Sequence, residues 1–180
     1  IEPLGAPLEA PFSGRPCVAY EYDAKQGGEG AASAMAGFAL APSVIRSHRG
    51  DVHLLGFSML DAGKEKHLAD PAARERATRW AATTEFQEMG LAKVGAMFSA
   101  LDQAMADDDG SVRTDLRTKD LGAEGRAACT LKEKVILPGE TVTAIGIWDA
   151  AKGGLVPRLR DKSAIVRITP GGGAAAVAHA

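Results

Sequence analysis

The chain has 180 residues and a formal charge of −2, with 21 basic and 23 acidic side chains. This length suits one domain with a real core and one sizeable insertion, and it is short for two full domains. The near-balanced charge gives no global attraction to a polyanion, so nucleic acid is a disfavoured partner. No run of about 18 apolar residues occurs, which excludes a membrane-spanning helix within the printed sequence. The sequence starts at Ile1, which is compatible with the removal of a preceding signal or anchor.

The first half of the chain carries three strand signals. Residues 17–22 (CVAYEY) follow directly after a proline and predict a short strand. Residues 37–45 predict a weaker strand, interrupted by Pro42 and followed by a polar turn at 46–50. Residues 52–60 are largely apolar on both faces, which is typical of a central strand. His53 lies in this strand, and we interpret it as a hydrogen-bonded structural residue in preference to a catalytic base.

A helical insertion is predicted over about residues 70–106. Asp70 is an N-cap acceptor, and Pro71 follows at the one helical position where its missing N–H does no harm. A second helix is indicated by apolar residues that recur mostly at spacings of three and four, although two glycines weaken its earlier turns. Its predicted buried face includes Leu91, Phe98 and Leu101.

The last part of the chain predicts a hairpin and one more strand. Residues 127–137 and 141–148 are joined by Pro138-Gly139, whose order suits a type II turn. Gly146 lies inside the second arm and indicates a bulge or a sharp bend. Residues 163–169 alternate as a strand does, and the low-complexity tail at 170–180 predicts a disordered end or a linker.

Together these elements predict a mainly β (α+β) fold. About five or six short strands, with a glycine-kinked hairpin and a helical insertion between the third and fourth strands, are the outline of a small OB-like β-barrel. We therefore expect one domain over residues 1–169 with its insertion at about 70–106. A β-sandwich also fits the pattern, because strand spacing alone does not separate the two architectures.

Two short motifs carry a family resemblance. The run PFSGRPCVAY at 11–20 resembles the start of the GIDE domain, the membrane-side β module of mitochondrial RING ubiquitin ligases, which has bacterial relatives. The run LPGETVTAIG at 137–146 looks like the second landmark of that domain, a Pro-Gly-acidic turn leading into a strand that ends in glycine. The helical insertion and the charged stretch after it depart from the short connection of the family. The positions that carry the resemblance are Pro16, Cys17, Tyr20, Pro138, Gly139 and Gly146.

The resemblance implies a module without chemistry of its own. The resemblance implies that Cys17 is the first inward-facing residue of a strand whose start is fixed by Pro16. Cys17 is then a buried thiol of the core and not a nucleophile. Cys17 and Cys129 are too few for a disulfide framework or an all-cysteine zinc site, and they could form one bridge or remain buried thiols. The ligase activity of the family belongs to a separate zinc-binding RING domain that this sequence does not contain. What carries over is a module that is tethered to a membrane from outside this segment.

Other candidate motifs do not predict a catalytic, cofactor or metal site. Aligning Gly110 with the sixth position of an EF-hand loop places Met105 and Leu116 where carboxylates are required, so Asp107–Asp109 fail as an EF-hand. A looser cation site that also uses Asp115 stays open beside the plainer interpretation, an acidic loop that ends a helix. The glycines at 27–30 lack the Gly-Lys-Ser/Thr of a phosphate loop.

Charge is distributed unevenly along the chain. Residues 151–167 hold five basic side chains against one acidic, a balance of +4, and residues 61–110 hold six basic against ten acidic, a balance of −4. The basic segment, with Arg158, Arg160 and Lys162, could be a solvated face, could meet the acidic segment, or could lie against anionic headgroups. We expect a non-catalytic interaction module of a membrane-anchored protein, with a protein or a membrane surface as partner. The alternative is an OB-fold domain that binds single-stranded nucleic acid or a nucleotide, and an enzyme ranks third.

Overall fold

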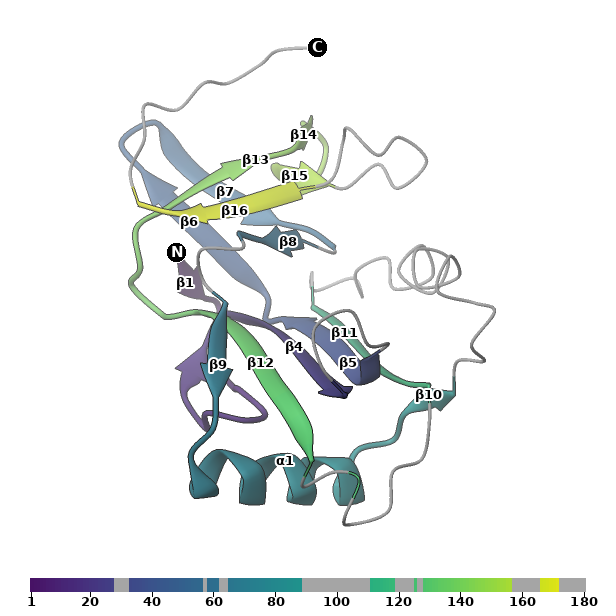
Figure 1. The fold of residues 1–180 in the computed structure, drawn as a ribbon. Coiled ribbons are helices and arrows are strands. Elements are labelled where there is room, and N and C mark those ends of the chain that lie inside the picture. The colour runs from purple at the N-terminus through teal and green to yellow at the C-terminus, as the bar shows by residue number, and fades with distance from the viewer. Residues whose placement is uncertain are drawn as a thin grey trace.

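The computed structural model describes residues 1–27, 33–56, 58–61, 65–88, 111–118, 125, 128–156 and 166–171. Within these residues the fold is mainly β, with one α-helix and strands that join in four sheets (Figure 1). The prediction of a mainly β fold is confirmed. Hydrogen bonding among the described strands does not close into a barrel.

The largest sheet has six strands and is antiparallel except at one edge. Its order is β10 (Gln87–Glu88), β11 (Val112–Arg117), β5 (Ser33–Leu40), β4 (Ala19–Gln26), β12 (Cys129–Ile136) and β9 (Lys66–Leu68). Only β10 and β11 run parallel among these pairs. The central strands β4 and β12 pair over their full length, from Ala19 opposite Ile136 to Gln26 opposite Cys129.

Two further sheets pack against one face of the first, and a small one covers part of its other face. The five-stranded sheet has the order β1 (Glu2–Pro3), β6 (Ser43–Ser47), β7 (Gly50–Leu54), β15 (Gly154–Val156) and β14 (Ile147–Asp149). The three-stranded sheet has the order β13 (Val142–Ile145), β16 (Val166–Pro170) and β8 (Ser58–Leu60). The two-stranded sheet joins β2 (Leu8–Glu9) to β3 (Pro16–Cys17).

The six-stranded sheet separates two hydrophobic cores. The first core lies between this sheet and the two upper sheets, and it includes Val18, Leu40, Leu54, Leu60, Ile136, Val166 and Ile168. The second core lies on the opposite face, between the six-stranded sheet on one side and α1 with the two-stranded sheet on the other. It includes Phe12, Cys17, Tyr20, Tyr22, Met35, Ala77 and Leu131. Both faces of the sheet are therefore covered, as the lower half of Figure 1 shows for α1.

Helix α1 (Pro71–Thr83) begins where the sequence predicts. The Asp70 side chain caps it by accepting from the Ala73 N–H at 2.8 Å, and Pro71 occupies the first turn. Its buried face is made of the small residues Ala73 and Ala77, which let the helix approach the sheet closely. The second predicted helix, with Leu91, Phe98 and Leu101, lies outside the described residues. In the described part of the chain we find no helix with the length and apolarity to cross a bilayer.

Two details of the predicted strands are wrong. The apolar run 52–60 is not one central strand, because the chain turns at Gly56, with φ of 94°, and β7 and β8 belong to different sheets. The predicted hairpin does not form: β12 pairs with β4 and β9, whereas β13 pairs with β16. The turn between them exists but carries the chain from one sheet to another.

Candidate functional site

The first motif of the sequence lies in the core under the helix. Cys17 is fully buried, as predicted, and its thiol donates to the Leu8 carbonyl at 3.6 Å. Burial is the main cause that raises the pKa of Cys17 to about 12, with the Glu133 carboxylate adding to it. Both cysteines are free, and Cys129 is also buried. A thiol held protonated in this way is a poor nucleophile at neutral pH.

The turn before Cys17 is fixed by two charged side chains from distant elements. The buried carboxylate of Glu133 accepts from the backbone N–H of Phe12 at 2.7 Å and from that of Ser13 at 3.2 Å. From α1, the Arg76 Nε donates to the Phe12 carbonyl at 2.6 Å. These contacts hold the backbone of the first motif against the sheet. The buried carboxylate of Glu133 therefore has a structural role, because it binds the backbone of the turn that precedes Cys17.

A buried polar cluster lies on the same face of the sheet. The Tyr22 hydroxyl donates to Asp115 Oδ1 at 2.7 Å, and the Arg113 Nε donates to Oδ2 of the same carboxylate at 2.8 Å. The Arg113 guanidinium lies 4.9 Å from the centre of the Trp80 ring. Burial, and then the Asp115 charge, raise the pKa of Tyr22. Asp115, which the sequence suggested for a cation site, therefore has two donors already, and its predicted acidic companions at 107–109 lie outside the described residues.

Gly37 makes room for this cluster. It lies opposite Tyr22 on one neighbouring strand and opposite Asp115 on the other. A Cβ at this position would come within 2.7 Å of the Thr114 carbonyl oxygen and would also overlap the Tyr22 ring. The tyrosine ring can therefore lie flat across β5 only because residue 37 has no side chain.

The opposite face of β4 and β12 carries a row of charged side chains that ties two sheets together. The Lys134 ammonium lies 2.7 Å from Glu21 Oε2 and also donates to the Leu60 carbonyl at 3.0 Å. The other Glu21 oxygen accepts from the Leu60 N–H at 2.6 Å. This ion pair from the six-stranded sheet thus satisfies both backbone groups of Leu60, at the end of β8 in the three-stranded sheet.

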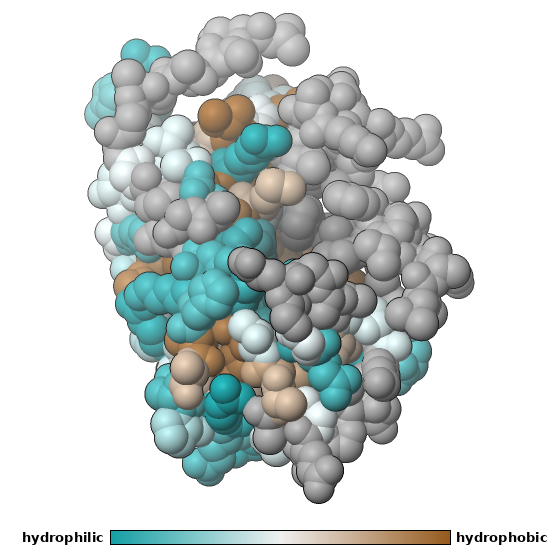
Figure 2. Space-filling view, viewed as in Figure 1, coloured by the Kyte–Doolittle hydropathy of each residue, from teal (hydrophilic) through white to brown (hydrophobic). Residues whose placement is uncertain are grey.

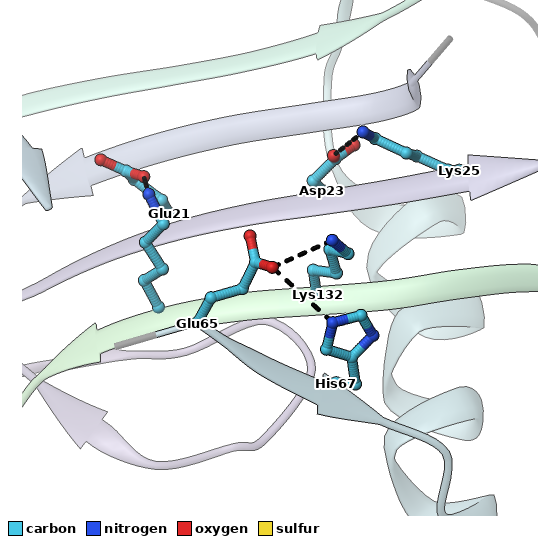
Figure 3. Close-up of polar contacts among 7 residues, drawn as sticks. Glu21, Asp23, Lys25, Glu65, His67 and Lys132 are labelled. Atoms are coloured by element: carbon cyan, nitrogen blue, oxygen red, sulfur yellow. Dashed lines mark hydrogen bonds and ion pairs between the residues drawn. The ribbon is translucent and has the colours of Figure 1, made fainter. Parts of the chain in front are cut away.

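The row continues outward in more exposed pairs. Lys25 lies 3.4 Å from Asp23, and Glu65 lies 2.9 Å from Lys132 and 3.7 Å from His67. Figure 3 shows Glu65 reaching over β12 toward both of its partners. The hydrogen bond from Lys132 is the main cause that lowers the pKa of Glu65. Opposite charges alternate along this row, so it attracts neither anions nor cations strongly.

The second motif forms the passage between sheets. Leu137 accepts from the Glu140 N–H at 3.2 Å across Pro138-Gly139, and Gly139 has φ of 76°, as a type II turn requires. Gly146 marks the break between β13 and β14, which belong to different sheets, so the predicted bend is confirmed. A Cβ on Gly146 would come within 2.9 Å of the Val166 side chain.

Large apolar side chains reach solvent on either side of Gly146. Ile145 is 55 % exposed and Trp148 is 52 % exposed. Arg167 lies directly opposite Ile145 on β16 and is exposed, and Lys152 is exposed in the turn after β14. Figure 2 shows a small group of hydrophobic residues at the surface in the upper part of the view and a larger hydrophilic area in its middle. Arg158, Arg160 and Lys162 of the predicted basic surface lie outside the described residues.

His53 and Trp80 lie in different parts of the fold. His53 lies in β7, where its backbone N–H donates to the Gly153 carbonyl at 3.2 Å. Trp80 is half-buried under Arg113 and packs against both Tyr20 and Tyr22. No group of three or more potential metal ligands occurs among the residues that the structure describes.

Sequence reasoning missed the buried Glu133, the Tyr22–Asp115 pair and the exposed Trp148. A glycine inside an apolar strand at position 37 was the available signal for a close approach. Comparison of the chain with protein-family models, with curated proteins and with solved structures finds no match.

Proposed function

We propose that this chain is a non-catalytic interaction module of a membrane-anchored protein, similar to the GIDE domain and built on an OB-like arrangement of strands. The observation that carries the proposal is the exposure of two large apolar side chains on edge strands, Ile145 on β13 and Trp148 on β14, with Arg167 paired opposite Ile145. Exposed aromatic and branched side chains at a sheet edge are typical of contact surfaces.

The use of the charged residues supports the same proposal. Glu133 and Arg76 hold a turn, Glu21 and Lys134 hold Leu60, and Asp115 holds Tyr22. In each case a charged group satisfies an internal hydrogen-bonding partner. These side chains make a rigid scaffold, and a rigid scaffold lowers the entropic cost of presenting a contact surface.

The alternative function is binding of single-stranded nucleic acid. The specific observation in its favour is that Trp148 offers an exposed ring for stacking close to Lys152, at the start of a segment with a charge balance of +4. Single-strand binding surfaces ordinarily present several such rings. Tyr20, Tyr22 and Phe12 are buried and cannot serve.

Cell fractionation of the full-length gene product tests the leading proposal. We expect the protein to sediment with membranes and to stay there after washing with high salt and with alkaline carbonate. Release of the full-length protein into the supernatant without any wash would contradict membrane anchoring. Release by salt alone would indicate a peripheral protein and would also contradict the tether.

A further inference from the structure

We draw no further inference here: the strongest candidate, the exposed Trp148 on the edge strand β14 of the five-stranded sheet, is a single apolar side chain, and nothing among the described residues shows what covers it.

Discussion

Replacing Tyr22 by phenylalanine tests the buried hydrogen bond from its hydroxyl to Asp115. The change removes the hydroxyl that donates to Asp115 at 2.7 Å and leaves the ring against Trp80. Asp115 is 6 % exposed, so water cannot readily replace the lost donor, although Arg113 still holds the other oxygen. A hydrogen bond to a charged group contributes about 1.5–3 kcal/mol, and we expect Tyr22→Phe to lower the free energy of unfolding by about 2 kcal/mol.

Urea unfolding measured by far-UV circular dichroism gives this quantity directly. Tyr20→Phe is the matched control, because Tyr20 is equally buried in the same aromatic cluster, whereas no hydrogen bond from its hydroxyl to a described residue is found. The control should change stability by less than about 0.5 kcal/mol. Equal effects of the two variants would refute the assignment of stability to the Tyr22–Asp115 bond.

The free energy of unfolding should fall at alkaline pH, and Tyr22 should contribute to this fall. The folded-state pKa of Tyr22 is raised by burial and then by the Asp115 charge. Its ordinary value is about 10, so the unfolded chain loses this proton first as the solution becomes alkaline. Stability is therefore fully present below about pH 10 and falls above it. Tyr22→Phe should lose stability less steeply than the wild type in that range.

Three further predictions concern the scaffold. Gly37→Ala should lower stability by about 1–3 kcal/mol in urea, because the new methyl group would overlap the Tyr22 ring and a backbone carbonyl; an unchanged midpoint would show that β5 can shift. Lys134→Met should cost about 1–3 kcal/mol, because the Leu60 carbonyl loses its ammonium donor and Glu21 loses its ion-pair partner. The Leu60 N–H, which donates to Glu21, should then exchange faster, whereas Lys25→Met, at a more exposed pair, should cost less than about 0.5 kcal/mol. Cys17 should react slowly with a thiol reagent at neutral pH until the protein unfolds, since burial raises its pKa to about 12, and rapid labelling would reopen a chemical role for it.

Local signals predicted local structure well. The N-cap Asp70 with Pro71 placed the start of α1, and Pro138-Gly139 placed a turn, because both features depend on neighbouring backbone geometry. The pairing of strands was not predictable in the same way. β12 pairs with β4, more than a hundred residues earlier in the chain, and nothing near the turn at 138–139 indicates that preference.

The burial of charged residues was the second feature that could not be predicted from the sequence. The alternation of residues along β12 predicts which face of the strand Glu133 occupies. It does not predict that Glu133 is buried, because a carboxylate is expected to lie on the solvent face. Its role depends on Phe12 and Ser13, which the fold alone brings to it. The exposure of Trp148 was equally hidden, because an apolar residue in a strand predicts burial and only the complete sheet order shows that β14 lies at an edge.

The position of β16 constrains how the molecule assembles during synthesis. This strand lies between β13 and β8, and its Val166 and Ile168 join a core that also contains Ile1. A ribosome that has released the chain only as far as β15 leaves two strands without their shared neighbour and the first core without two of its buried side chains. The core under α1, which reaches from Ala10 to Leu131, needs none of those late residues. The core beside α1 can therefore form in the nascent chain before β16 is synthesised, whereas the first core needs β16 to be completed.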